Sequence, residues 1–194
     1  MKYKALIVPF VAVGLSGCLN DDDDSNASPD SRDGTWIQSC HLDKYNDPVD
    51  SRIIINGAES IYEITDYEDM ACLQPLRTTR LEVISIVGKE LTLSNGTLAT
   101  ETDNTITGLF LTPKAGIQAT LLNTSQHCGI VTWAAGKTEN IENCYEDLFN
   151  GRVFYDIYKV QNNRLYEGDD ASGSGDTPEE RPTSLDIEFF YQRQ

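Results

Sequence analysis

From residue 34 onward, short runs of alternating apolar and polar residues are separated by turn residues, a pattern typical of β-strands. In LEVISIVG, Leu81, Val83 and Ser85 fall on one face, with Glu82 and Ile84 on the other. Several strands carry apolar residues on both faces, which indicates that they line a cavity or are covered on both sides. The expected strands span residues 34–40, 52–55, 61–65, 80–87, 91–93, 105–112, 117–122, 129–133, 153–160, 164–166 and 184–191.

Turn residues join many of these strands to the next one along the chain. Asn56-Gly57 is typical of a two-residue hairpin turn, and Asn95-Gly96 marks another turn. About 8–10 strands in sequential hairpins predict an all-β fold, a single antiparallel up-and-down β-barrel over residues 34–194. A β-sandwich is the alternative.

Two segments depart from this pattern. In TENIENCYEDLFNG, apolar residues recur at helical spacing and Gly151 suits the position after a helix, which predicts one short helix over residues 140–150. Residues 168–182 are rich in Gly, Ser and Asp, which predicts a long mobile loop before the final strand.

The first seventeen residues have the composition of a secretory signal peptide. Lys2 and Lys4 precede an apolar run, and small residues follow it. The run is about eleven residues long, whereas a bilayer core needs about twenty. We therefore expect residues 1–17 to be a leader that is removed.

Leu15-Ser16-Gly17-Cys18 resembles the lipobox of bacterial lipoproteins. The resemblance implies that the leader is cut before Cys18, which is acylated on its thiol and amine by chains such as palmitate. These chains would anchor the protein stably in the bilayer. Residue 19 is Leu rather than Asp, which by the enterobacterial sorting pattern implies an outer-membrane lipoprotein of the cell envelope. The folded domain would then lie in the periplasm or at the cell surface.

Between the lipid cysteine and the first strand, the chain is acidic and lacks aromatic residues. We expect residues 18–33 to form the lipidated cysteine and a flexible, solvated tether. The whole chain has 15 Lys and Arg against 31 Asp and Glu, a formal charge of −16. This balance argues against nucleic acid as a partner, because binding phosphates requires basic patches.

The four cysteines after Cys18 are expected to form disulfides, as is usual in an exported domain. Three pairings are possible. We favour Cys40–Cys72 and Cys128–Cys144, because each pair closes a local loop between expected neighbours.

A zinc site is the other hypothesis for two of these cysteines, since Cys40-His41 and His127-Cys128 hold the only two histidines of the chain. Adjacent residues on a strand point to opposite faces, so both pairs do not easily converge. We therefore predict disulfides and no metal site.

Candidate catalytic groups lack the arrangement that chemistry requires. Ser125 and His127 have no obvious orienting acid beside them. The segment 170–176 resembles the opening of an EF-hand loop, but Arg181 falls where the final carboxylate ligand must be. We predict that the protein is not an enzyme and has no cofactor. A cluster of paired carboxylates, expected by chance in so acidic a chain, is formed by Glu63, Asp66, Glu68 and Asp69.

Gly34-Thr35-Trp36, followed by about 160 residues, resembles the opening of the lipocalin-like barrels. The resemblance implies that Trp36 closes one end of the barrel and that Arg193, or else Arg181, stacks on it. Thr65-Asp66-Tyr67 comes much earlier than the corresponding motif of that family, and no C-terminal helix is evident. The chain is also similar to small uncharacterised envelope lipoproteins of Gram-negative bacteria, with GTW near a first cysteine and a later Cys-Gly…Trp.

Two functions follow as expectations. In the first, the mouth of the barrel binds a small apolar or amphipathic ligand, and a cavity of at least ~300 Å³ would support this. In the second, side chains fill the barrel, and the protein is an interaction module or structural accessory of the outer membrane with an unknown protein partner. The tyrosines that favour the first are Tyr62, Tyr67, Tyr155, Tyr158, Tyr166 and Tyr191.

Overall fold

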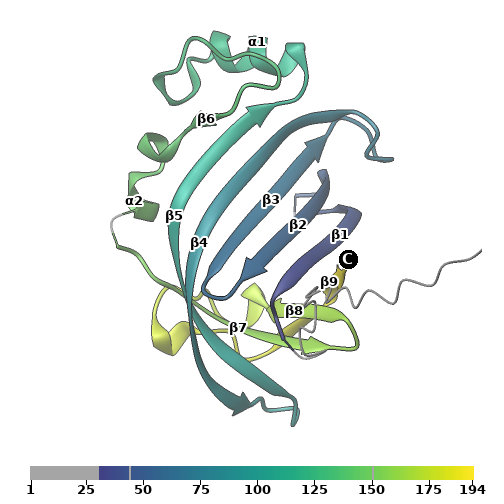
Figure 1. Cartoon of the computed structure of the whole chain (residues 1–194), viewed down its shortest axis with the longest axis vertical. Coiled ribbons are helices and arrows are strands. Elements are labelled where there is room, and N and C mark those ends of the chain that lie inside the picture. The colour runs from purple at the N-terminus through teal and green to yellow at the C-terminus, as the bar shows by residue number, and fades with distance from the viewer. Residues whose placement is uncertain (1–30, 44, 150) are drawn as a thin grey trace, which may run out of the picture.

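A computed structural model of the chain describes residues 31–43, 45–149 and 151–194. Its main feature is a closed antiparallel barrel of eight strands in the order β1-β2-β3-β4-β5-β7-β8-β9 (Figure 1). This confirms the expected all-β single barrel. The strands are β1 (Gly34–Leu42), β2 (Pro48–Asn56), β3 (Glu59–Tyr67), β4 (Pro75–Thr92), β5 (Leu98–Pro113), β6 (Glu139–Asn140), β7 (Phe154–Gln161), β8 (Arg164–Gly168) and β9 (Leu185–Arg193). The leader, Cys18 and the acidic tether up to residue 30 lie outside the described residues.

The barrel is built from hairpins between consecutive strands, and it closes where the two ends of the domain meet. Strand β1 pairs with β9 through Trp36 opposite Arg193 and Ile37 opposite Gln192. The longest pairing is the β4–β5 hairpin, which extends past both ends of the shorter strands β7, β8 and β9 (Figure 1). The barrel wall is therefore uneven in height, and its short side is formed by β7–β9.

Three hairpin turns lie where the sequence predicts them, but the expected break between strands 80–87 and 91–93 is wrong, because β4 runs through it. Gly57 has φ 60° in the β2–β3 turn, and Gly96 has φ 81° between β4 and β5. Between β7 and β8, Asn162 and Asn163 have φ 55° and 58°, a left-handed conformation that asparagine tolerates well. These turns fix which strands become neighbours.

Side chains fill the end of the barrel where β1 begins and β9 ends. Trp36, Ile53, Ile55 and Leu165 are buried there in one cluster. Residues 31–33, which we assigned to the tether, pack on this end. The indole Nε1 of Trp36 donates a hydrogen bond to the Arg32 carbonyl at 2.7 Å.

The expected strands 117–122 and 129–133 are wrong. The first is the helix α1 (Gly116–Thr124), and the second follows a tight turn at His127–Gly129 and has no regular structure. A short apolar run does not distinguish a strand from a helix by periodicity alone. In the fold, α1 buries Ala119 and Leu122 in a cluster with Trp133 and Leu109 of β5, and this packing decides for the helix.

The expected helix over 140–150 is also largely wrong. Strand β6 (Glu139–Asn140) continues along β5, a turn follows at Glu142–Cys144, and only α2 (Glu146–Phe149) is helical. The Asn140 side chain accepts a hydrogen bond from the Glu142 amide at 2.9 Å, which favours a turn over a helix.

The segment between β8 and β9 is ordered, in contrast to the mobile loop that we expected. It forms turns at Asp170–Ser172 and Pro178–Glu180. The Arg181 guanidinium fastens the segment by donating to the carbonyls of Thr102 and Asp156 at 2.9 and 2.6 Å. Gly175 has φ 70° and lies against Tyr155, where a Cβ would come within 2.6 Å of the Tyr155 carbonyl oxygen. Only glycine suits this position.

A candidate ligand cavity in the barrel

A cavity of about 550 Å³ opens at the end of the barrel opposite Trp36. The end of β1, the beginning of β2 and the end of β3 form one side of it. The end of β8, β9 from Asp186 to Tyr191 and the turn at Asp170–Ser172 form the other. Its lining is Gln38, His41, Asp43, Val49, Ser51, Ile64, Asp66, Glu167, Gly168, Asp169, Asp170, Ala171, Asp186, Phe189 and Tyr191.

The opposite end is closed by the pair that the lipocalin-like resemblance implies. The guanidinium of Arg193 lies 4.3 Å from the centre of the Trp36 ring. It also donates a hydrogen bond to the Asp33 carbonyl at 2.8 Å and another to the Ser31 carbonyl. Arg181, the other candidate, stacks instead on Tyr155, with its guanidinium 5.3 Å from the ring centre. The barrel is thus sealed at one end and open at the other.

Glu167 lies at the inner part of the cavity. Its Oε1 accepts a hydrogen bond from the Tyr62 hydroxyl at 3.0 Å across the barrel. Asp156 lines a smaller hollow of about 210 Å³ together with Tyr62 and with Glu167, which lines both spaces. The Asp156 carboxylate accepts from the amides of Ile157 and Gly168 at 2.7 and 3.1 Å. Two carboxyl groups therefore come together inside the barrel.

The interior of the barrel changes the acidity of these groups. Burial, and then the nearby Asp156 charge, raise the pKa of Glu167 from 4.5 to about 8. Burial raises the pKa of Asp156 from 3.8 to about 6, although its two amide hydrogen bonds and the Arg181 charge act in the opposite direction. The pKa of Tyr191 is also raised, by burial and by Glu167. Near neutral pH, Glu167 is thus mostly protonated and can exchange its proton.

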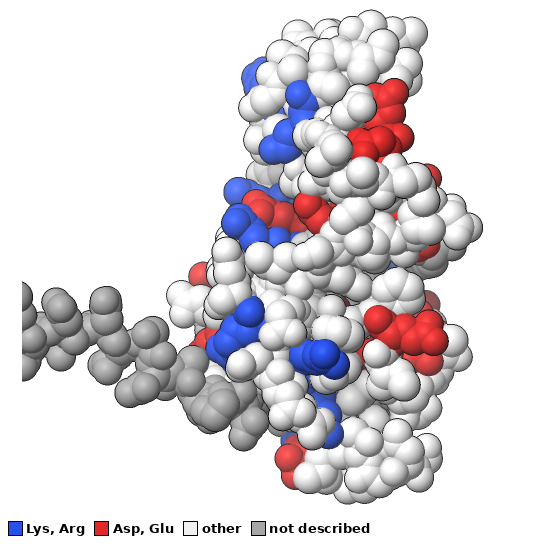
Figure 2. Space-filling view, turned by 90° about the vertical axis from the view of Figure 1, so that its right-hand side faces the viewer, with Lys and Arg blue, Asp and Glu red and all other residues white. Residues whose placement is uncertain are grey.

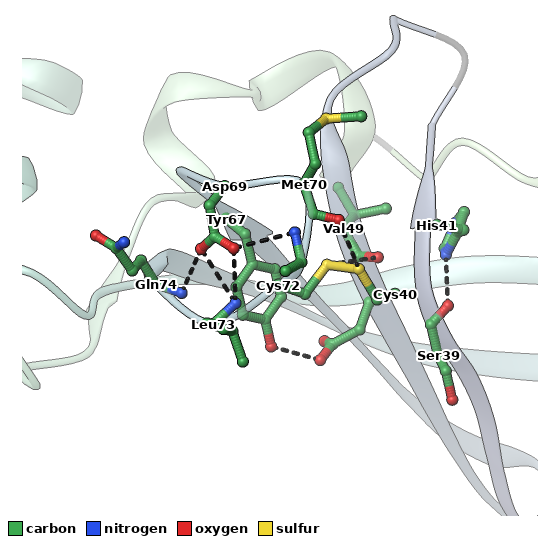
Figure 3. Close-up of a disulfide and its surroundings, with 12 residues drawn as sticks. Ser39, Cys40, His41, Val49, Tyr67, Asp69, Met70, Cys72, Leu73 and Gln74 are labelled. Carbon is green, nitrogen blue, oxygen red and sulfur yellow. Dashed lines mark hydrogen bonds between the residues drawn. A yellow bond between two sulfur atoms is a disulfide. The ribbon is translucent and has the colours of Figure 1, made fainter.

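The rim beside β1 is a short loop between β3 and β4 whose backbone is hydrogen-bonded to the Asp69 side chain (Figure 3). The Asp69 carboxylate accepts hydrogen bonds from the amides of Ala71, Leu73 and Gln74 at 3.0, 3.1 and 2.7 Å. The Cys40–Cys72 disulfide ties this loop to the end of β1. The loop holds the apolar side chain of Leu73 at the surface, 78% exposed.

The two expected disulfides are both confirmed. Cys40 is bonded to Cys72 and Cys128 to Cys144, across separations of 32 and 16 residues. Among the described residues, one set of possible metal ligands converges, His127 with Cys128 and Cys144, but its two sulfur atoms are bonded to each other. His41 lies elsewhere, with its Nδ1 3.1 Å from the Ser39 carbonyl oxygen.

The carboxylates that the sequence placed in one cluster are separated in the fold. Glu63 pairs with Arg52 at 2.6 Å and Asp66 with Arg77 at 2.5 Å, in both cases across neighbouring strands. Asp69 forms the rim loop. Of the four, Asp66 alone lines the cavity.

Ser125 and His127 likewise contact different partners. The Ser125 hydroxyl donates to the Leu122 carbonyl at 3.1 Å, at the end of α1. The His127 ring packs against Trp133 with ring centres 6.0 Å apart. Burial and the Arg77 charge lower the pKa of His127.

The six tyrosines that we expected to favour ligand binding lie in different surroundings. Tyr191 lines the main cavity, and Tyr62 lines the smaller hollow. The Tyr67 hydroxyl donates to Asp50 at 2.5 Å. The other three rings lie beside arginine or aromatic side chains: Tyr155 beside Arg181, Tyr158 beside Arg32, and Tyr166 beside Phe190.

Sequence reasoning missed Glu167 and Asp156 as site residues. A signal was present, because Asp156 lies two residues from both Phe154 and Tyr158, and Glu167 lies two residues after Leu165. Residues two apart on a strand share a face, so both carboxyl groups belong to the inward face of the barrel.

No protein-family model matches this chain, and no curated protein is similar to it. None of the helices in the described part of the chain is long and apolar enough to span a membrane.

Proposed function

We propose that the barrel binds one small apolar or amphipathic ligand in the cavity opposite Trp36. The volume of about 550 Å³ carries this proposal, since ligand cavities begin near ~300 Å³. Val49, Ile64 and Phe189 supply apolar contacts, and Glu167 with Tyr191 supplies a small number of polar ones. The alternative, a barrel filled by side chains that acts as an interaction or structural module, would need this space to be occupied.

We further propose that the protein is an envelope lipoprotein that carries its barrel on a lipid anchor. The lipobox around Cys18 and the acidic tether after it support this proposal. The Cys18→Ser variant is expected to incorporate no fatty-acid probe in cells, whereas the wild type is labelled. Equal labelling of the two would refute the anchor and leave the proposed cavity untouched.

A cavity-filling substitution tests the ligand proposal. Ser51 is 7% exposed on β2 and lines the cavity, so Ser51→Leu should place a larger side chain in the space that the ligand needs. We expect the affinity for the neutral apolar dye Nile red, measured by its fluorescence, to fall at least about tenfold, the equivalent of about 1.4 kcal/mol.

The matched control is Ser39→Leu, which makes the same change on an exposed position of β1. It should bind the dye as the wild type does. Thermal unfolding of both variants separates loss of binding from loss of folding, because overpacking alone costs about 1–3 kcal/mol. Unchanged dye binding by a folded Ser51→Leu protein would remove the support for a cavity ligand.

A further inference from the structure

We infer that the ligand of this cavity is an organic cation, an amphiphile whose ammonium group is held by Glu167 with Asp156 beside it. This inference rests on the proposed function and names the chemical class of its ligand. Three features support it: the acidic charges in the cavity wall, the lack of an ion pair at Glu167 among the described residues, and the apolar groups around Glu167.

The ionisable lining of the cavity is almost entirely of one sign. Apart from His41 and the phenol of Tyr191, every ionisable side chain in it is acidic, and it contains no lysine and no arginine among the described residues. An anionic ligand such as a fatty acid would meet repulsion from every side in a partly desolvated space. The acidic lining residues are Asp43, Asp66, Glu167, Asp169, Asp170 and Asp186.

Most of these carboxylates already have a partner, which is either an arginine on the next strand or a nearby backbone amide. Asp66 is paired with Arg77, and Asp43 accepts amide hydrogen bonds from Tyr45 and Asp47 at 2.8 Å. Asp169 accepts from the Ala171 amide and Asp186 from the Glu188 amide, at 2.9 and 3.0 Å.

Glu167 differs from them. Its carboxyl group receives one side-chain hydrogen bond, from Tyr62, and no ion pair between described residues includes it. It therefore remains available to a cationic ligand.

The charged groups around Glu167 reinforce this preference. Asp156 and Asp170 both raise its pKa, so the negative potential at this point is already high. Arg181 is directed toward the main chain of Thr102 and Asp156 and toward Asp103. Arg32 lines a small hollow together with Asp156 and Glu167, but no ion pair between described residues joins it to either carboxylate. Its guanidinium stacks 5.4 Å from the Tyr158 ring centre and donates to the Gly57 carbonyl. A ligand cation would relieve repulsion that these arginines leave uncompensated.

The remaining lining suits an organic cation better than a metal ion. Glu167 and Asp156 belong to no group of three converging metal ligands among the described residues. Val49, Ile64 and Phe189 instead offer apolar surface, and the aromatic rings of Phe189 and Tyr191 favour a neighbouring ammonium group. The surroundings thus fit a positive head with an apolar body.

The experiment compares three probes that share one alkyl chain: decyltrimethylammonium, decanoate and decanol. Each is titrated into the full-length protein by calorimetry, below its micelle concentration, from about pH 6 to about pH 9. We expect decyltrimethylammonium to bind at least about tenfold more tightly than the other two above pH 8.

The pH dependence identifies the group that holds the cation. Decyltrimethylammonium carries no proton, so binding it to the Glu167 carboxylate requires loss of the Glu167 proton. Below a pKa of about 8 the affinity should rise with pH, by up to tenfold per unit, and it should level off above that pKa. The Glu167→Gln variant keeps the acceptor for Tyr62 and should show weaker binding without this rise.

Glu188→Gln is the matched control, because it removes the same charge from an exposed position on β9. It should keep the pH profile of the wild type, which separates a specific site from attraction to a chain of net charge −16. The face drawn in Figure 2 carries both basic and acidic side chains, and the attraction of a ligand to such exposed charges is screened by salt.

The other outcomes are also decisive. Binding of decanol or decanoate as tight as that of decyltrimethylammonium would overturn the cationic ligand and leave the cavity proposal standing. A Glu167→Gln profile identical to that of the wild type would overturn the role of Glu167. Failure of all three probes to bind would contradict the cavity proposal itself.

Discussion

At the scale of single residues, two arginines stack on aromatic rings in different surroundings. Arg193 lies over the buried ring of Trp36 and donates hydrogen bonds to the carbonyls of Asp33 and Ser31. Arg164 lies 4.1 Å from the centre of the Phe190 ring but is exposed on β8. Cation–π contacts and charged hydrogen bonds are stronger where water is excluded, so Arg193 should contribute far more to stability.

We therefore expect Arg193→Met to lower the free energy of unfolding by about 2–4 kcal/mol, while Arg164→Met costs less than about 1 kcal/mol. Urea unfolding, followed by tryptophan fluorescence, measures both changes. Equal effects of the two substitutions would mean that Arg193 does not secure the closed end of the barrel.

Residues also show where the sequence is informative. A stacking arginine for Trp36, either Arg193 or else Arg181, could be predicted because a short motif, G-x-W, resembles that of the lipocalin-like barrels. Glu167 could not be identified in the same way, since a single acidic residue in RLYEG resembles a solvated position. What distinguishes Glu167 is its partner Tyr62, which is 105 residues away in the chain.

At the scale of elements, the two disulfides hold different parts of the molecule. Cys40–Cys72 joins β1 to the rim loop beside the cavity. Cys128–Cys144 joins the turn after α1 to the turn after β6, away from the cavity lining. Each closes a loop of moderate length, and such cross-links act mainly by restricting the unfolded chain.

Replacing either pair by serines should lower the free energy of unfolding by about 3–4 kcal/mol in the chain-entropy account. Only the double variant Cys40→Ser, Cys72→Ser should also weaken Nile red binding, because only that disulfide holds the rim loop against β1. Denaturant unfolding and dye titration are measured on both double variants. If both weaken dye binding alike, the rim loop has no special part in the cavity.

Elements were predicted correctly where turn residues determine the hairpin, and incorrectly where packing against distant residues determines the secondary structure. The β2–β3 and β7–β8 hairpins follow from glycine and asparagine in left-handed turns. The α1 segment was misassigned because its short apolar run fits a strand or a helix, and its contact with Trp133 and β5 is long-range. The Gly/Ser-rich segment before β9 was expected to be mobile because the contacts of Arg181 are invisible in the sequence.

At the scale of the whole molecule, the barrel is closed at Trp36 and open at the other end. Sequential hairpins made the barrel predictable, because such connections leave few topologies. The cavity was not predictable, since its volume depends on how inward side chains from all strands fill the space. Its acidic wall arises from segments far apart in the chain, including β3, β8, β9 and Asp43, which directly follows β1.

The central claim is that this open barrel holds a small ligand, and native mass spectrometry of the detergent-solubilised full-length protein tests it most directly. The wild type, purified from its native host, should retain one noncovalent ligand that is released on unfolding. Folded Ser51→Leu should retain little of it. Spectra in which both proteins appear without any noncovalent ligand would contradict the claim.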